Sequence, residues 1–293
     1  MNGPAIVAVC IILAPLLISR LPSIGPPEED LYYSVPITVE DIETVKPTTV
    51  FPTTKNTNKS SKPISKIDFQ KLQFKLPNYD NLQLIECLGL DMKRLAEVKR
   101  KFPIDAVKQI AKIRDFLARY NIRVLLGDGT LLGWYRECSF IPHTKDIDLH
   151  VLPSDYNNGL WNLQTEPDSP AKIAQILGKP FNMFEVKLRM REGIKVPVDI
   201  FFLQHEGNNT YSFLLDLNNG KRYRAKLPRI DELCRAKLHE ETFLVPCNVE
   251  ETLTMEYGNW TKDQTGFSWN KSPKNLQDGG KWSKTDMKNM GHV

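Results

Sequence analysis

The hydrophobic pattern predicts a mixture of helices and strands beyond about residue 67. Over residues 103–120 apolar side chains recur every three or four positions behind Pro103, which is typical of an amphipathic helix. Its apolar stripe consists of Ala106, Ile110, Ile113 and Leu117. Residues 123–126 form a short apolar run, and residues 146–152 alternate polar and apolar side chains, so both stretches are predicted to be strands.

Further elements follow towards the C-terminus. We expect helices over residues 131–136, 171–177 and 231–238. Paired strands are predicted over residues 184–190 and 196–203, with more short strands around Asn219 and Gly220. A Trp-rich tail runs from Trp260 to Trp282. Together these elements indicate an α+β fold with a mostly antiparallel or mixed sheet and flanking helices.

A short apolar run begins the chain. Residues 5–18 read AIVAVCIILAPLLI, fourteen residues without a charge, and no Lys or Arg precedes them. A helix that spans a bilayer needs roughly 20 apolar residues. We interpret residues 1–20 as a signal-anchor or a cleaved signal peptide. The anchor would make a single-pass protein of the endoplasmic reticulum or Golgi membrane with a luminal domain, and cleavage would make a secreted one.

Residues 21–66 are dominated by Pro, Thr, Ser and Lys and keep no period long enough to build a core, so we interpret them as a stalk. Residues 67–293 are the predicted globular domain. The chain is 41% hydrophobic and 25% charged, which is ordinary for a globular protein. Its net charge of +4 is spread over the whole length. That charge suits anionic substrates and is too small to indicate a nucleic-acid partner.

The cysteines are compatible with an oxidising compartment. Cys10 lies in the apolar run, and the remaining four are Cys87, Cys138, Cys234 and Cys247. Four cysteines allow two disulfides in three connectivities, and a bridge between Cys234 and Cys247, the pair closest in sequence, is one candidate. The sequence has no CxxC pair and no Cys/His cluster, so we do not expect a structural zinc site. Sequons that a luminal chain would expose to glycosylation are at Asn58, Asn208, Asn259 and Asn270.

Two motifs with chemical meaning stand near the middle of the chain. Residues 127–133 read GDGTLLG between a predicted strand and a predicted helix, where small residues and a helix N-terminus favour a bound phosphate. Asp146 and Asp148 form a DxD motif, and residues i and i+2 of a strand point to the same face. Adjacent carboxylates repel each other, and a hard cation such as Mg²⁺ or Mn²⁺ relieves the repulsion. Each motif alone is also common as an ordinary turn or a solvated pair.

A third carboxylate, Asp199, lies in the apolar segment VPVDIFF. A carboxylate among apolar residues is costly unless it is paired or bound to a metal, and an ion pair with Arg191 or Lys195 is the alternative. A phosphate turn, a DxD strand about 16 residues later and a single Asp on a further strand follow the plan of nucleotidyltransferase-fold active sites. There, three carboxylates hold one or two magnesium ions against the phosphates of a nucleotide.

The stretch GDGTLLGWYRECSFIPHTKDIDLHV also resembles the signature of the LicD/fukutin family. The shared features are G-T-L-L-G, an Arg followed by an IP segment, the DxD, and an apolar-flanked Asp as in VPVDIFF. The resemblance covers residues 122–152 and 196–203, and the Y-G-x-W segment at residues 257–260 is also similar to the family.

The resemblance implies a nucleotidyltransferase-like phosphotransferase. Members move ribitol phosphate or phosphocholine from a CDP-linked donor onto a glycan or glycoprotein acceptor. By position, the implied catalytic and metal-binding residues are Asp146, Asp148 and Asp199, and the implied donor-binding residues are Gly129, Thr130 and Arg136. The metal would be Mg²⁺ or Mn²⁺, and Asp199 is the candidate general base.

Asp128 departs from the family pattern, because an acid stands beside the phosphate turn where a small or neutral residue is expected. It would point to solvent or contact a ribose or a metal-bound water. His143, near the DxD, is a candidate catalytic group or an ordinary loop histidine. Two other functions remain open, namely a nucleotide-sugar glycosyltransferase with a DxD motif and an inactive relative that binds glycans or scaffolds another transferase.

Overall fold

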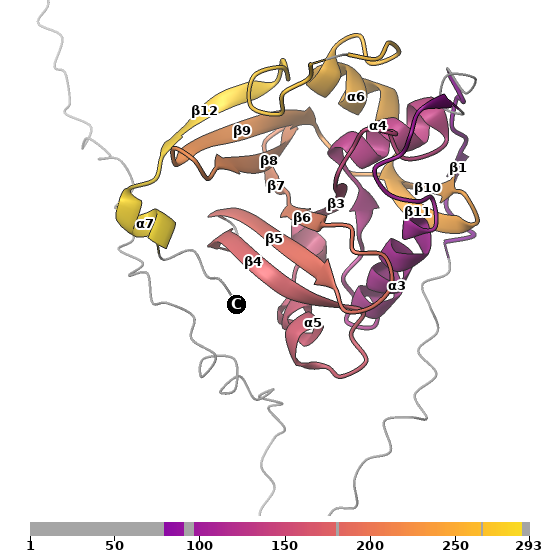
Figure 1. The fold of residues 1–293 in the computed structure, drawn as a ribbon. Coiled ribbons are helices and arrows are strands. Elements are labelled where there is room, and N and C mark those ends of the chain that lie inside the picture. The colour runs from indigo at the N-terminus through magenta and orange to yellow at the C-terminus, as the bar shows by residue number, and fades with distance from the viewer. Residues whose placement is uncertain (1–78, 91–96, 180–181, 265, 289–293) are drawn as a thin grey trace, which may run out of the picture. The chain divides into compact units, whose positions relative to one another are not determined.

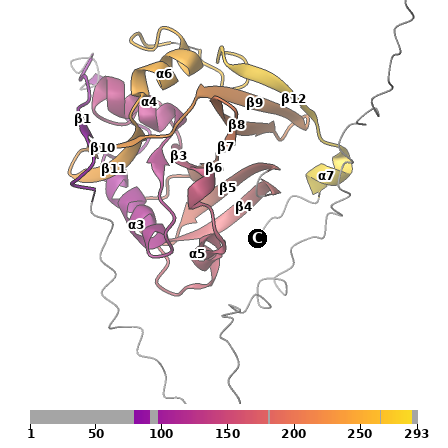
Figure 2. The ribbon, with the colours of Figure 1, turned by 180° about the vertical axis from the view of Figure 1, so that it is seen from behind.

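The computed structural model describes residues 79–90, 97–179, 182–264 and 266–288. The predicted signal segment, residues 1–20, and the predicted stalk, residues 21–66, lie outside these ranges, as does the predicted start of the domain at residue 67. No helix among the described residues has the length and the apolar character needed to cross a membrane. Figures 1 and 2 show the described elements from opposite sides.

The main sheet is mixed and has eight strands in the order β1-β10-β11-β2-β3-β6-β5-β4. In that order the strands are β1 (Leu84–Ile85), β10 (Leu233–Leu238), β11 (Glu241–Pro246), β2 (Leu125–Leu126), β3 (Ile147–Val151), β6 (Val198–Phe202), β5 (Asn182–Met190) and β4 (Ala171–Lys179). In the middle, β3 pairs in parallel with β6, and β6 pairs antiparallel with β5. All five residues of β6 are buried, which is typical of a central strand covered on both faces.

A second, antiparallel sheet of four strands has the order β12-β9-β8-β7. Its strands are β7 (Gln204–Glu206), β8 (Asn209–Asp216), β9 (Lys221–Pro228) and β12 (Leu276–Lys281). The turn between β8 and β9 ends at Gly220, whose φ of 72° favours glycine. Strand β8 contacts β5 and β6, so the second sheet borders the half of the main sheet that ends at β4 (Figure 1).

The helices are short and few among the described residues. They are α3 (Ala106–Ala118), α4 (Asp128–Glu137), α5 (Asn162–Thr165), α6 (Val249–Tyr257) and α7 (Lys284–Lys288), with 3₁₀ turns at Pro153–Asp155 and Asn158–Trp161. Helix α3 confirms the amphipathic pattern, because each residue of the predicted stripe is fully buried. Helix α4 confirms the helix predicted over residues 131–136 but begins earlier, at Asp128, so that GDGTLLG after its first glycine is helical, and the helix is capped by Cys138 in the left-handed conformation.

The α+β class is confirmed, with sheet dominating the core. The paired strands predicted over residues 184–190 and 196–203 correspond to β5 and β6, and the strands predicted around Asn219 and Gly220 correspond to β8 and β9. Two helix predictions are wrong.

Residues 171–177 belong to strand β4, not to a helix. The pairing of β4 with β5 shifts between Ile173 and Gln175 and again between Leu177 and Lys179. A bulge adds a residue and breaks the alternation of a strand, so the apolar positions take helix-like spacing.

Residues 233–238 form strand β10, although helix-favouring residue types predict a helix there. Cys234, Ala236 and Leu238 are fully buried, at the period of two that a strand requires. Pairing with β11 and a neighbouring disulfide hold the strand, and this tertiary context outweighs helix propensity.

The four described cysteines form two disulfides, Cys87–Cys138 and Cys234–Cys247. The candidate bridge between Cys234 and Cys247 is therefore confirmed, and it links the start of β10 to the end of β11. The other bridge ties the segment after β1 to the C-terminal end of α4. There, Leu88 N donates to Tyr135 O at 2.8 Å and Leu90 N donates to Arg136 O at 2.6 Å.

Candidate active site

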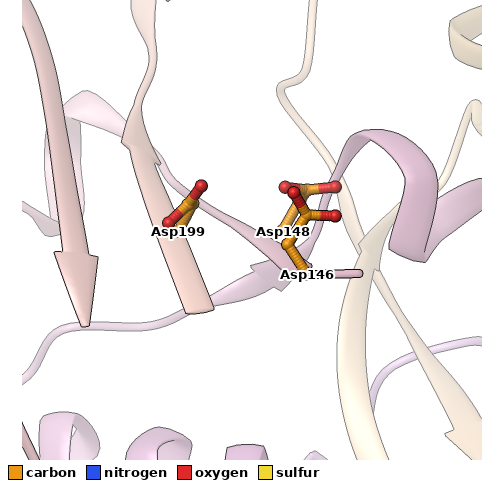
Figure 3. A group of neighbouring side chains, drawn as sticks. All are labelled: Asp146, Asp148 and Asp199. Carbon is orange, nitrogen blue, oxygen red and sulfur yellow. The ribbon is translucent and has the colours of Figure 1, made fainter. Parts of the chain in front are cut away.

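The three predicted carboxylates come together in the middle of the main sheet. Asp148 on β3 and Asp199 on β6 are register partners in a parallel pair, so their side chains leave the same face of the sheet. Asp146 immediately precedes β3. One oxygen of each carboxylate lies within 4.8 Å of the others, and Figure 3 shows the three side chains as one group. The predicted convergence is confirmed, and the catalytic and metal-binding roles stay predictions.

The GDGTLLG segment places its glycines and Thr130 beside Asp148. Gly127 N donates to Asp148 O at 3.1 Å, and a Cβ at Gly127 would lie 2.4 Å from the His150 ring, so only glycine fits there. A Cβ at Gly129 would lie 3.4 Å from Asp148 Oδ2, which places this glycine beside the carboxylate. Thr130 is buried, and its Oγ1 accepts a hydrogen bond from Asp148 N at 2.9 Å. Thr130 thus fixes the start of α4 to β3.

The Asp128 side chain lines the cleft, is 19% exposed, and is held by neighbouring side chains. Its φ of 39° is left-handed, and its Oδ2 accepts a hydrogen bond from His150 Nε2 at 2.9 Å. The carboxyl group of Glu256 on α6 is also hydrogen-bonded to Asp128, and burial and then the Asp128 charge raise the pKa of Glu256 well above its usual range. His150 and Glu256, to which the sequence pattern assigns no role, hold Asp128 at the edge of the site.

The partner of Asp199 is Lys187, not Arg191 or Lys195. Lys187 Nζ donates to Asp199 Oδ2 at 2.8 Å and lies 2.6 Å from Glu185 Oε1. Lys195 instead donates to two backbone carbonyls. Residues 185 and 187 alternate with apolar neighbours on β5, which is the signal that could have placed them on one face. Only the register of β5 on β6 brings that face against Asp199.

Arg136 lies at the end of α4 with its guanidinium already engaged. It is 3% exposed, its Nη2 lies 2.7 Å from Glu137 Oε1, and its Nη1 donates to Trp260 O at 3.2 Å. These bonds tie the segment after α6 to α4 and so shape the wall of the cleft that Arg136 lines. A contact between Arg136 and a donor phosphate stays a prediction.

Burial and mutual repulsion dominate the electrostatics of the site. Burial, followed by the charges of Asp128, Asp146 and Asp199, raises the pKa of Asp148 well above its usual range. Burial also raises the pKa of Asp199, although Lys187 opposes this. A site that disfavours its own negative charges in this way is suited to a cation.

The pKa values of the neighbouring ion pair, Glu185 and Lys187, are also shifted. Burial raises the pKa of Glu185 to about 7 in spite of Lys187. Burial lowers the pKa of Lys187, but the charges of Glu185 and Asp199 outweigh this and raise it, so the ammonium stays protonated.

These groups open into a cleft of about 920 Å³ with two unlike walls. The acidic wall comes from α4, β3, β5 and β6. The opposite wall comes from β8, β9 and the segment after α6, and it exposes Leu217, Phe267 and Trp269 at 41%, 37% and 43%. Phe267 packs against Tyr257 with ring centroids 5.3 Å apart, and Trp269 packs edge-on against Tyr223 at 5.9 Å. Exposed aromatic side chains gathered in one cleft indicate a surface for ligand binding.

Residues 121–248 match the family model described as LicD/FKTN/FKRP, nucleotidyltransferase domain. The match includes Asp146, Asp148, Asp199 and the GDGTLLG turn, together with Glu185 and Lys187. Glu256 and the aromatic wall lie beyond its C-terminal limit.

Curated relatives agree with the family model. Two uncharacterized proteins of Caenorhabditis elegans are 30% identical over 226 residues and 33% identical over 213 residues, which is 74% and 70% of this chain. The chain spans 60% and 55% of the length of these two relatives. The ribitol-5-phosphate transferase FKTN of Homo sapiens is 28% identical over 167 residues, 57% of this chain and 35% of that protein. Residues 121–248 are therefore identified as a domain of the LicD/FKTN/FKRP nucleotidyltransferase type.

Proposed function

We propose that this chain is a metal-dependent phosphotransferase that moves a polyol-phosphate or phosphocholine group from a CDP-linked donor to a glycan or glycoprotein acceptor. The observation that carries the proposal is the convergence of Asp146, Asp148 and Asp199 beside the glycine-rich turn of α4. The family match and the name of the human relative support the transfer of a phosphorus-bearing group. The resemblance in sequence supports the CDP carrier.

The donor set fits a hard divalent cation. Three carboxylates offer one oxygen each within 4.8 Å, and Mg²⁺ and Mn²⁺ prefer charged oxygen ligands. Burial, and then the neighbouring negative charges, raise the pKa of Asp148, and burial raises the pKa of Asp199, so a bound cation would favour the charged form of both. When bound, the metal would neutralise the donor diphosphate and the charge that develops on the leaving CMP.

Residues of the chain would bind the donor phosphate, accept the proton of the acceptor hydroxyl and hold the substrates. The start of α4 at Gly129 would lie against a donor phosphate, where backbone N–H groups and the helix field favour negative charge. An acceptor hydroxyl would attack the distal phosphorus in line, a new P–O bond would form, and the bond to the CMP oxygen would break. Asp199 is the candidate to take the hydroxyl proton. The aromatic wall with Phe267 and Trp269 would hold the ring-shaped parts of the substrates.

Release of CMP tests this function against its alternatives. The full chain would be incubated with Mg²⁺, a mixture of glycoprotein acceptors, and CDP-ribitol, CDP-choline or a UDP-sugar in turn. CMP released from a CDP-linked donor, and lost in Asp148→Asn, supports the proposal. Release of UDP from a UDP-sugar would point to a glycosyltransferase. Glycan binding without turnover of any donor would point to an inactive relative.

We also propose that the domain is luminal, in the Golgi or the endoplasmic reticulum, and reaches the membrane through the N-terminal segment. The two disulfides support an oxidising compartment. The sequon residues Asn208 and Asn259 are exposed, so a glycan fits on either. Treatment of the full chain from animal cells with an N-glycosidase should therefore lower its mass. An unchanged mass and free thiols would contradict this location.

A further inference from the structure

Lys187 occupies the cross-strand position in line with two of the predicted metal ligands. Asp148 on β3 is the register partner of Asp199 on β6, and Asp199 is in turn the register partner of Lys187 on β5. Side chains at paired positions of neighbouring strands leave the same face of a sheet, and neighbouring strands lie about 4.8 Å apart. Asp199 is therefore flanked by the carboxylates on one side and by an ammonium on the other.

The ammonium is held rather than free to move. Its Nζ lies 2.6 Å from Glu185 Oε1 and 2.8 Å from Asp199 Oδ2. The Glu185 side chain is 6% exposed, so burying its charge is costly unless the lysine stays in place. The Lys187 side chain is 31% exposed and lines the cleft. An ammonium has three N–H donors, and these two carboxylates use two of them, which leaves one for a ligand in the cleft.

The other cations that line the cleft are built differently. Lys145 and Lys262 are exposed. The guanidinium of Arg136 is hydrogen-bonded to Glu137 and to the backbone carbonyl of Trp260. Among the described basic residues of the cleft, Lys187 alone is fixed by ion pairs beside the three aspartates.

We propose that Lys187, held in place by Glu185, is a phosphate-binding residue that acts as a second, fixed cation beside a single divalent metal ion. This rests on the proposed function, in which the aspartates bind the metal and the donor carries a diphosphate. The proposed ligand of Lys187 is a phosphate oxygen of that diphosphate. A second divalent ion at this place would have to displace the ammonium from Asp199.

The charges of the site predict how the loss of Lys187 would change the affinities for the metal and for the diphosphate. When all are ionised, Asp146, Asp148, Asp199 and Glu185 carry four negative charges, beside that of Asp128, and a divalent ion together with Lys187 supplies three positive ones. Removing the lysine charge makes the site more negative, so a metal cation should bind more tightly and an anionic diphosphate less tightly. A lysine that only supports the fold would not move the two affinities in opposite directions.

The test measures two affinities on the full chain, that of Mn²⁺ and that of CDP at saturating Mn²⁺. The wild type should bind one Mn²⁺ per chain. Lys187→Met should bind Mn²⁺ several-fold more tightly and CDP about 10- to 100-fold more weakly, which is the effect of losing one charge-assisted hydrogen bond. Lys145→Met, which removes an exposed lysine of the same cleft, should change CDP binding by less than about threefold.

A second variant is needed because Lys187→Met leaves Glu185 buried without its partner and can fail to fold. The double variant Glu185→Gln with Lys187→Met removes both charges. It should bind Mn²⁺ with about the wild-type affinity, since the lost charges offset each other, and should still bind CDP about 10- to 100-fold more weakly.

The outcomes separate this inference from the function on which it rests. Unchanged CDP affinity in Lys187→Met or the double variant, a parallel loss of both affinities, or two Mn²⁺ ions per wild-type chain would overturn the inference alone. A folded wild type that binds no Mn²⁺ would instead overturn the proposed function and this inference with it.

Discussion

Replacing Asp148 by asparagine keeps the shape of the side chain and removes one of three neighbouring charges. The carboxylate oxygens of Asp146, Asp148 and Asp199 lie within 4.8 Å of one another. At that distance two unit charges repel by about 3.5 kcal/mol with an effective dielectric constant of about 20. Asp148 is half-buried, and solvent screens part of this repulsion. Without metal, Asp148→Asn should therefore unfold with a free energy about 1–3 kcal/mol higher than the wild type.

Saturating metal should reverse part of this difference. A hard-cation site loses affinity when a charged oxygen ligand becomes neutral, and a weakening of about 100-fold is the expected order. A metal concentration of about 100 times the wild-type Kd stabilises the wild type by about 2.7 kcal/mol, but a variant with a Kd equal to that concentration by only about 0.4 kcal/mol. The same variant should release CMP more slowly, because the site holds less metal.

Urea unfolding in EDTA and in Mg²⁺ measures both effects. Glu232→Gln, which removes one exposed charge outside the cleft, serves as the matched control and should follow the wild type in both buffers. A folded Asp148→Asn that keeps the full stabilisation by Mg²⁺ would show that Asp148 is not a metal ligand. A variant less stable than the wild type in EDTA would show that repulsion does not dominate the apo site.

Three further predictions follow from the packing around the site. The pKa of Glu185 is raised to about 7 from 4.5, so the folded state holds a proton that the unfolded state releases, and stability falls as pH rises through this window. Glu185→Gln should reduce that loss by about 2–3 kcal/mol in unfolding free energies measured in EDTA at pH 5 and pH 8, and an unchanged slope would contradict the raised pKa. Gly129→Ala should fold normally, because its Cβ meets only Asp148 Oδ2 at 3.4 Å, but should weaken CDP binding in a direct titration. Gly133→Ala should lower the melting temperature instead, because its Cβ would lie 2.7 Å from a backbone oxygen, and equal melting of the two glycine variants would refute this contrast. Replacing Cys87 and Cys138 by serine opens a loop with a sequence separation of 51 and should cost up to about 4 kcal/mol in urea unfolding. A cost near zero would mean that the unfolded chain is not restrained by this bridge.

Local patterns in the sequence were sufficient for the elements whose side-chain period is regular. The stripe of α3 and the alternation of β3 follow from periods of 3.6 and 2 that neighbouring residues carry on their own, and the strands around Asn219 and Gly220 were predicted from that turn-favouring pair. The set of three aspartates was also predictable, because a carboxylate among apolar residues is costly without a partner, and its spacing from the DxD and the glycine-rich segment follows the plan of nucleotidyltransferase-fold sites. Where bulges interrupt the period, as in β4, the same reasoning predicted the wrong element.

The partners of the site residues were decided only by the tertiary structure. Lys187 meets Asp199 through the register of β5 on β6, and His150 on β3 meets Asp128, which follows the neighbouring strand β2. Arg136 is bonded to its neighbour Glu137 and to the segment after α6. The first two contacts depend on which strands lie side by side and in which register, and the contact of Arg136 with Trp260 depends on where the segment after α6 packs, and neither leaves a period in the sequence. The aromatic wall of the cleft arises in the same way, because the second sheet and the segment after α6 reach the aspartates only in the folded chain. The sequence alone therefore predicted which residues form the candidate site, and the packing of the two sheets determined what surrounds them.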